Sequence, residues 1–221
     1  MTHILPPTPA SVALAAEVLR AGGVVAFPTD TVYGLGAAAS QEEAVRALYE
    51  IKGRPEAKAI PLLLADAGDL PQVAQDVPPL AERLAADWWP GPLTLVLPAR
   101  PEIPEVVRSG GATVAVRVPD HGLARDLIRA VGQPLATTSA NRSGAPEART
   151  AAEVVQQLGG RVEWVIDGGE SPGGRPSTVV DVTVHPPVVR RWGAIAPEAL
   201  APLLQAAERA GRGGRSRRPP R

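Results

Sequence analysis

Residues 24–65, VVAFPTDTVYGLGAAASQEEAVRALYEIKGRPEAKAIPLLLA, contain an apolar stretch, a polar loop, an amphipathic stretch and a second apolar stretch. VVAFP (24–28) is typical of a short buried strand. Ser40 and Glu43 predict a capping box for a helix over about 41–51, and IPLLLA (60–65) predicts a second strand. This alternation of strands with helices is typical of an α/β domain.

The same alternation continues on both sides of this segment. Further helices are predicted over 9–20, 78–87, 122–131, 150–158 and 198–208, the fourth with a capping box of Thr150 and Glu153. Further strands are predicted over 93–99, 113–119, 134–138, 162–167, 177–183 and 188–192. We therefore predict an α/β fold over 1–208, a single domain with a mixed sheet flanked by helices. The Arg-rich residues 209–221 are predicted to form a disordered tail.

Composition excludes several classes of protein. The chain of 221 residues has no net charge, but residues 1–208 carry 17 positive and 23 negative side chains. Such an acidic body is not typical of a folded surface that wraps nucleic acid. The absence of cysteine excludes disulfides and thiolate chemistry. Because neither a signal peptide nor an apolar run of ~20 residues is found, we expect a soluble, cytoplasmic protein without membrane contact.

Both lysines of the chain, Lys52 and Lys58, flank Arg54, although the chain otherwise uses arginine for positive charge. Cations just past a helix C-terminus compensate the helix dipole, which contributes about 0.3–1 kcal/mol. Arginine would serve that purpose equally well, whereas a compact ammonium differs from a guanidinium at a crowded anion. The pattern therefore favours an anion site, with a surface loop as the alternative.

Three polar loops follow predicted strands, where open α/β sheets bind ligands: PTDTVYGLG (28–36), TSANRSG (138–144) and GGESPGGRPST (168–178). By spacing alone the first is equally compatible with an ordinary turn, and the second favours a helix-capping turn. The third favours a lid over a ligand. Gly34 and Gly36 are predicted to let the backbone approach a ligand closely.

Histidine and metal chemistry are not expected. His3, His121 and His185 lie outside these loops, and we predict that they are surface residues rather than bases. No group of His, Asp and Glu has the spacing of metal ligands, so any Mg²⁺ would arrive on a nucleotide triphosphate. The residues thus indicate a cationic pocket for a small polyanion, which would catalyse by positioning and electrostatics.

Seven stretches between residues 8 and 196 resemble, in order, the YrdC-like family of threonylcarbamoyl-AMP synthases. They are FPTDTVYGLG, KGRPEAK…PL, WWPGPLTLVL, TVAVRVPDH, TSANRSG, IDGGESPGGRPSTVVD and VVRRWGAI. The resemblance, which is to the short single-domain form, implies a twisted mixed sheet with a concave cationic pocket. It also implies that L-threonine, bicarbonate and ATP are converted to threonylcarbamoyl-AMP and pyrophosphate, for the threonylcarbamoyladenosine modification of tRNA.

The resemblance assigns roles to individual residues. As catalytic cations that hold phosphates and reaction anions it implies Lys52, Arg54 and Lys58. As ATP contacts it implies Arg54, Thr113, Ser139, Asn141, Ser177, Thr178 and Arg191. As threonine contacts it implies Thr31, Arg117 and Thr137. Ala59, Ile60 and Ala65 replace polar residues of some members, which leaves part of the contacts unassigned.

The resemblance further implies partners. ATP would be a substrate, accompanied by Mg²⁺, and no cofactor would be tightly bound. Proteins that transfer the threonylcarbamoyl group to tRNA would consume the product, and contact of this chain with tRNA would be at most weak. Two alternatives stay open: a paralogue of the same fold in another pathway, and a non-enzymatic RNA-binding module.

Overall fold

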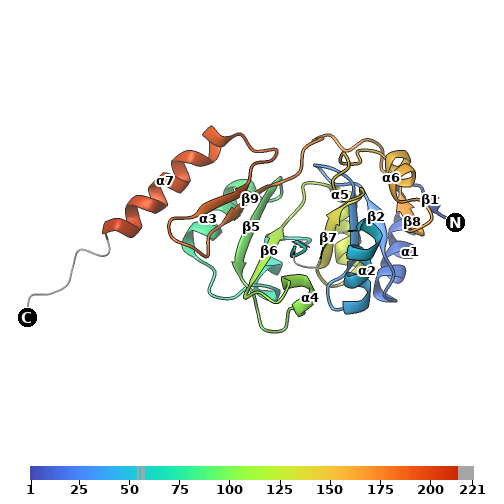
Figure 1. Cartoon of the computed structure of the whole chain (residues 1–221), viewed down its shortest axis with the longest axis horizontal. Coiled ribbons are helices and arrows are strands. Elements are labelled where there is room, and N and C mark those ends of the chain that lie inside the picture. Colours follow the sequence, from blue (N-terminus) through green and yellow to red (C-terminus); the bar gives the residue numbers. More distant parts are fainter. Residues whose placement is uncertain (54, 56–57, 214–221) are drawn as a thin grey trace, which may run out of the picture.

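A mixed sheet forms the centre of the protein (Figure 1) in the computed structural model, which describes residues 1–53, 55 and 58–213. The strands are β1 (His3–Leu5), β2 (Val25–Phe27), β3 (Gly34–Ala38), β4 (Leu62–Leu63), β5 (Leu93–Pro98), β6 (Thr113–Arg117), β7 (Leu135–Ser139), β8 (Trp164–Ile166), β9 (Thr178–Asp181) and β10 (Val188–Arg191). The helices are α1 (Pro9–Arg20), α2 (Glu42–Lys52), α3 (Pro79–Trp88), α4 (Glu105–Arg108), α5 (Gly122–Val131), α6 (Ala151–Leu158) and α7 (Pro197–Gly213), with a 3₁₀ helix η1 (Ala67–Gln72).

The order of the strands brings distant parts of the sequence together. It is β1-β8-β2-β3-β7-β4-β6-β5-β9-β10. β1 and β2 run parallel to β8, β4 runs parallel to β6, and β5 runs parallel to β9. The other neighbouring pairs are antiparallel. The prediction of an α/β fold with a mixed sheet is therefore confirmed.

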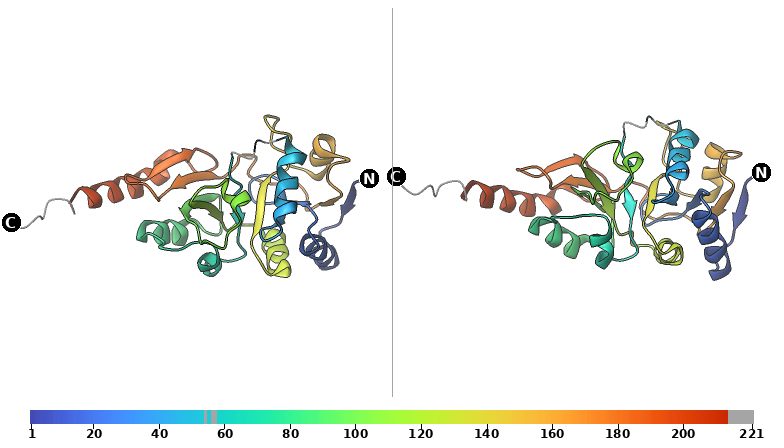
Figure 2. Two further views of the ribbon diagram at one scale, coloured as in Figure 1. Left: turned by 60° about the horizontal axis from the view of Figure 1, so that its bottom comes forward. Right: turned by 90° about the horizontal axis from the view of Figure 1, so that it is seen from below.

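Each face of the sheet carries its own apolar core. Leu62 packs into the core that α2, α3 and α6 cover, on what we call the first face. The neighbouring Leu63 packs into a separate core with α1 and α5, on the second face. This alternation follows from the pleat, because successive side chains of a strand point to opposite faces. The right-hand view of Figure 2 shows α2 and α6 on one side of the sheet and α1 and α5 on the other.

The helices on the second face leave part of it uncovered. The core beneath α1 and α5 includes Phe27 and Leu135, from β2 and β7. Second-face residues of β5, β6 and β9, among them Thr94, Ala115 and Val179, line a cavity instead. The fold therefore places an open, polar region beside a filled core on one face of the same sheet.

Glycines let the strands and loops beside this region pack closely. A Cβ on Gly36 would lie 2.8 Å from the ring of Phe27, and one on Gly34 would lie 2.8 Å from Thr137 Cγ2. Both glycines belong to the buried strand β3, which the sequence had indicated as loop. The prediction that Gly36 admits a ligand is wrong, because the Phe27 ring fills that space.

Helix ends show where local sequence signals hold and where they fail. Thr150 and Glu153 cap α6 reciprocally, as predicted. The predicted box of Ser40 and Glu43 is wrong: α2 begins after Gln41, whose side chain makes no capping bond. The chain turns sharply after β3, where Gln41 N donates to Ala38 O at 3.0 Å, so the helix starts one residue later than the box requires.

The C-terminal helix extends past the predicted domain boundary. α7 runs to Gly213 and projects from the β10 end of the sheet (Figure 1). Residues 209–213, which we had assigned to the disordered tail, are therefore part of this helix. The predicted disorder of 214–221 lies outside the described residues and stays a prediction.

The two candidate caps allow a matched test of helix capping. Thr150→Ala should lower the free energy of unfolding by about 1 kcal/mol, since it removes the acceptor for the Glu153 N–H. Ser40→Ala should change it by less than about 0.5 kcal/mol. Urea denaturation of both variants provides the measurement. Equal losses in the two variants would contradict the assignment of the caps.

Candidate functional site

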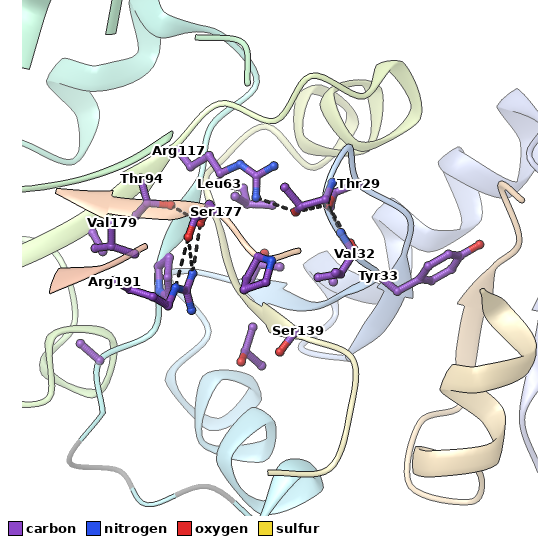
Figure 3. A pocket seen from close by; sticks show the side chains of 18 of the residues that line it. Thr29, Val32, Tyr33, Leu63, Thr94, Arg117, Ser139, Ser177, Val179 and Arg191 are labelled. Atoms are coloured by element: carbon purple, nitrogen blue, oxygen red, sulfur yellow. Dashed lines mark hydrogen bonds between the residues drawn. The ribbon is translucent and has the colours of Figure 1, made fainter. Parts of the chain in front are cut away.

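The cavity on the second face has a volume of about 280 Å³. Its walls come from the loop that follows β2, from the sheet, and from the segments before β9 and at the end of β10. We distinguish an Arg117 side (Thr29, Thr31, Arg117) from an Arg191 side (Thr94, Ser177, Arg191). Figure 3 shows Arg117 joined to the loop that carries Thr29, and Arg191 joined to Ser177.

On the Arg117 side, a buried guanidinium is held by three separate groups. Arg117 Nε donates to Gly91 O at 2.9 Å, Nη1 to Thr31 Oγ1 at 2.9 Å, and Nη2 to Asp30 Oδ1 at 2.5 Å. Burial lowers the pKa of Arg117, and the charge of Asp30 opposes that shift. These contacts use three of the five N–H groups of a guanidinium. Since Arg117 also lines the cavity, it can bind a carboxylate there.

On the Arg191 side, the second guanidinium is held by Ser177. Arg191 Nε and Nη2 donate to Ser177 O at 3.1 and 2.9 Å, and Ser177 Oγ lies 2.7 Å from Thr94 Oγ1. The charge of Arg191 contributes to lowering the pKa of Arg117, which shows that the two guanidiniums lie close enough to interact. Both line the same cavity. Two cations and several hydroxyls around one cavity suit a ligand with several negative groups.

Arg190 also lines the cavity, and the sequence analysis did not identify it. Its guanidinium donates to Asp181 Oδ2 at 3.0 and 2.8 Å. Burial raises the pKa of Asp181, but bonds from Thr183 and Arg190 outweigh it and hold the pKa below its usual value. The register of β10 shifts between Val189 and Arg191, which lets consecutive arginines reach the same cavity.

Lys52 lies in a cage of oxygen atoms next to the cavity. Its Nζ donates to Ser139 O at 2.5 Å, to Asn141 O at 2.7 Å and to Asn141 Oδ1 at 2.9 Å, and its side chain is buried. Ser139 Oγ lies farther away, at 3.4 Å, so oxygen atoms of Ser139 and Asn141 surround the ammonium, which has three N–H groups to donate. The cage supplies a physical reason for lysine at this position, since a planar guanidinium would not fit it.

Of the other two predicted cations, the structure describes only Lys58. Lys58 is exposed, and Lys58 N donates to Pro55 O at 3.2 Å. Arg54 lies outside the described residues. The catalytic roles of Lys52, Arg54 and Lys58 as anion ligands stay predictions.

Most of the predicted ligand contacts meet at the cavity. Those that line it are Thr31, Arg117, Thr137, Ser139, Ser177 and Arg191. Asn141 lies behind Ser139 in the Lys52 cage. Thr113 shares the second face with Ala115, because the two are separated by one residue of β6. Thr113 is not among the residues that line the cavity, and its contact with ATP stays a prediction.

The structure does not bring Thr178 to the cavity. Its partner in β5 is Leu93, which packs into the core of the first face. The buried Thr178 Oγ1 accepts from Gly193 N at 3.0 Å and from Ile195 N at 3.2 Å. The hydroxyl thus holds the chain that follows β10, and a contact with ATP would require it to face the other side of the sheet.

The glycine-rich segment 168–178 is tied to the loop after β2. Gly174 N donates to Thr31 O at 2.8 Å, and Tyr33 Oη donates to Gly169 O at 2.8 Å. Burial raises the pKa of Tyr33 to about 12, so its phenol stays a donor at neutral pH. Because Ser177 lines the cavity, the end of this segment forms part of the wall of the site, and its role as a lid stays a prediction.

Histidine lies outside the cavity lining of the described residues. His3 and His185 are exposed, as predicted. His121 is half-buried, and burial lowers its pKa. In the part of the chain that the structure describes, no cluster of His, Cys, Asp or Glu side chains could hold a metal ion.

No helix of the described residues has the length and apolar character needed to cross a membrane.

Comparison with known proteins provides independent evidence. The family model of Sua5, YciO and YrdC proteins, described as "Telomere recombination", matches residues 17–193. A Pyrococcus abyssi protein named threonylcarbamoyl-AMP synthase is 44% identical over 191 residues, which are 86% of this chain and 56% of that protein. A protein of the same name from Marinobacter nauticus is 36% identical over 80% of this chain and 93% of its own length.

A solved structure agrees with these relatives. The structure of P. abyssi Sua5 complexed with L-threonine superposes with a TM-score of 0.87 at 41% identity. The match covers 92% of this chain and 60% of that one. The chain thus spans little more than half the length of the first curated relatives that it matches.

The Lys52 cage predicts that charge alone cannot replace the lysine. Lys52→Arg should lower the free energy of unfolding by about 1–3 kcal/mol, because the larger guanidinium overpacks a buried site. Arg46→Lys provides the matched control, since Arg46 lies on the same helix with 40% of its side chain exposed. Urea denaturation measures both, and an unchanged stability of Lys52→Arg would contradict the cage.

Proposed function

Because the chain belongs to the Sua5/YciO/YrdC family, we propose that it is a threonylcarbamoyl-AMP synthase. It would convert L-threonine, bicarbonate and ATP to threonylcarbamoyl-AMP and pyrophosphate. The observation that carries the proposal is the presence of two arginines, the buried Arg117 and the exposed Arg191, around one cavity. The reaction brings a carboxylate, a carbamate and a triphosphate together, and such a site offsets their mutual repulsion.

Threonine would bind on the Arg117 side. The guanidinium of Arg117 would take its carboxylate, and Thr31 and Thr137 would contact the rest of the amino acid. Asp30 compensates the charge of the buried Arg117 through their ion pair. A buried arginine without such a partner would be costly, so the pair keeps Arg117 charged until a substrate carboxylate arrives.

ATP would bind across the Arg191 side. Arg191 and Ser177 would contact its phosphates, and Ser139 and Thr113 would contact the nucleotide along the sheet. The cavity of about 280 Å³ is at the lower limit of small-molecule sites, roughly 300–1,000 Å³. We therefore expect the nucleotide to extend beyond it over the uncovered face toward Thr113.

The chemistry needs positioning more than proton transfer. The neutral threonine amine forms a carbamate either with CO₂, releasing a proton, or with bicarbonate, releasing water. A carbamate oxygen then attacks the α-phosphorus of ATP as pyrophosphate leaves. Holding carbamate and phosphate in line lowers the entropic part of the barrier. The fixed cations stabilise the charge that develops on phosphate, and Lys58 and Arg54 would add to them.

Several further assignments belong to the same proposal. Mg²⁺ would arrive bound to ATP, and no tightly bound cofactor is required. The product would pass to proteins that transfer the threonylcarbamoyl group to tRNA, with at most a weak contact between this chain and tRNA. We place the reaction in the cytoplasm, where ATP and tRNA are available.

The direct test is release of pyrophosphate from ATP in the presence of bicarbonate, with and without L-threonine. The proposal predicts release that depends on threonine, together with an adenylate of the expected mass. ATP binding without this dependence would contradict the proposal and favour a paralogue of the same fold. Binding of neither ligand would favour an RNA-binding module.

Arg117 should separate the two substrates kinetically. Arg117→Lys keeps a positive charge beside Asp30 but loses the guanidinium fork. We expect the KM for threonine to rise about 30-fold and the KM for ATP to change less than about threefold. Arg125→Lys is the control, because Arg125 bonds Ala65 and Asp66 away from the cavity. Equal effects on both KM values would remove Arg117 from the threonine site.

A further inference from the structure

Arg190 lines the cavity, yet it has no role in the function proposed above. Its Nε and Nη2 donate to Asp181 Oδ2 at 3.0 and 2.8 Å, so the carboxylate fixes the position of the guanidinium. Thr183 N and Oγ1 donate to the other carboxylate oxygen, at 3.0 and 2.6 Å. The Asp181 side chain is only 7% exposed, whereas that of Arg190 is 56% exposed. A guanidinium that the protein holds in place is therefore accessible to a ligand.

Arg190 and Arg191 are anchored near opposite ends of β9. Arg191 is paired with Val179 and reaches back to Ser177, just before the strand (Figure 3). Arg190 reaches the other way, to Asp181 at the end of the strand. Asp181 follows Ser177 by four residues, which at about 3.3 Å per residue separates the two anchors by roughly 13 Å. The two guanidiniums can therefore contact different parts of one extended ligand.

The uncovered second face offers an apolar surface beside Arg190. Ala115 is paired with Val96, and Val96 is paired with Asp181, so these three form a row across β6, β5 and β9. Val96 and Ala115 are half-buried, and neither belongs to the two apolar cores. We call these two residues the apolar shelf. The ion pair of Asp181 and Arg190 lies at its end.

The position of the reacting groups determines which part of a nucleotide reaches the apolar shelf. In the register of the sheet, Arg117 lies level with Thr94 and with the Ser177 end of β9. The α-phosphate of ATP must meet the threonine carbamate there, because the new bond joins these two groups. A nucleoside that continues from this phosphate along the sheet passes over the apolar shelf and reaches the guanidinium held by Asp181.

We propose that the apolar shelf and Arg190 form the base-binding part of the ATP site. The base lies on Val96 and Ala115 and stacks against the Arg190 guanidinium, while Arg191 binds phosphate. A planar, delocalised cation stacks well on an aromatic ring. Asp181 is a positioning residue, because it holds the guanidinium and does not itself contact the ligand. The inference rests on the proposed function, since it takes ATP as the ligand.

Two other roles for Arg190 make different predictions. If the β- and γ-phosphates extended along β9, Arg190 would bind phosphate, and its loss would weaken every polyphosphate whether or not it carries a base. If Arg190 only tied β10 to β9, its loss would change the affinity for neither kind of ligand. Tripolyphosphate separates the three roles, because it has the phosphate chain of ATP and lacks the nucleoside.

The test compares ATP with tripolyphosphate, both with Mg²⁺, by isothermal titration calorimetry on the full chain. The variants are Arg190→Ala and Val96→Ala, of which the second removes apolar contact area and no charge. Arg129→Ala is the matched control, because Arg129 is also tied to a carboxylate, that of Asp66, and is 44% exposed away from the cavity. Thermal unfolding of each variant checks that it is folded.

We expect Arg190→Ala to weaken ATP about fivefold and tripolyphosphate less than about 1.5-fold. Val96→Ala should weaken ATP about threefold and leave tripolyphosphate unchanged. Arg129→Ala should change neither affinity. In a folded Arg190→Ala, equal weakening of both ligands or an unchanged affinity for ATP would overturn the proposal.

Poor folding or weak binding is covered by a second measurement. Arg190→Ala leaves the buried Asp181 with Thr183 as its remaining printed partner, so the variant can lose stability. In that case Val96→Ala decides the question alone, and an unchanged ratio of the two affinities overturns the proposal. If the wild type binds ATP but not tripolyphosphate, the loss in Arg190→Ala is measured at low and at high salt. A loss of stacking persists at high salt, whereas the loss of a phosphate contact is screened and would overturn the proposal.

The failure of this inference can be distinguished from the failure of the proposed function. A wild-type chain that binds no ATP would refute both. A wild-type chain that releases pyrophosphate in the presence of threonine, with variants that lack the expected pattern, would refute the inference only.

Discussion

The buried ion pair between Asp30 and Arg117 is the contact on which the architecture of the site depends. It joins the loop after β2 to the end of β6, although β3, β7 and β4 lie between those strands in the sheet. With 7% and 12% of their side chains exposed, neither charge is well hydrated. Losing one partner would leave the other buried and uncompensated, which typically costs about 3–5 kcal/mol. The pair therefore holds the loop over the uncovered part of the sheet.

The segments around that pair fit each other closely. A Cβ on Gly173 would lie 2.6 Å from Asp30 O and 2.9 Å from Thr31 Cα, so glycine is required where the segment before β9 crosses the loop. The same segment carries Ser177, which holds Arg191 on the other side of the cavity. Each cation of the site is thus fixed by a neighbour that the sheet brings to it from elsewhere in the chain. Such preorganisation suits a reaction that depends on the positions of charges.

Much of the fold could be predicted from local patterns. The capping box of Thr150 and Glu153 and the amphipathic pattern of 122–131 identified α6 and α5, because these signals lie within a few residues. Strand β3 was missed because GLGAA has no β-branched residue; burial between neighbouring strands makes it a strand. The capping box predicted from Ser40 was wrong because the start of α2 is set by the tight turn after β3, which local sequence does not indicate.

The site was predictable only in part for the same reason. Arg117 and Ser177 were identified through the resemblance, whereas the oxygen cage around Lys52 depends on Ser139 and Asn141, which are distant in sequence. No single-sequence signal distinguishes Arg190, which a register shift brings to the cavity. The contacts of Thr31 with Thr29 and Arg117 likewise require coordinates, because Arg117 is distant from both in sequence.

The central claim is that one cavity holds an amino acid on the Arg117 side and a nucleotide on the Arg191 side. A crystal structure of the protein with L-threonine and a non-hydrolysable ATP analogue would test it most directly. The account predicts the threonine carboxylate within hydrogen-bond distance of Arg117, and phosphate oxygens beside Arg191 and Ser177. Threonine bound elsewhere, or a nucleotide whose phosphates contact neither Arg191 nor Ser177, would contradict it.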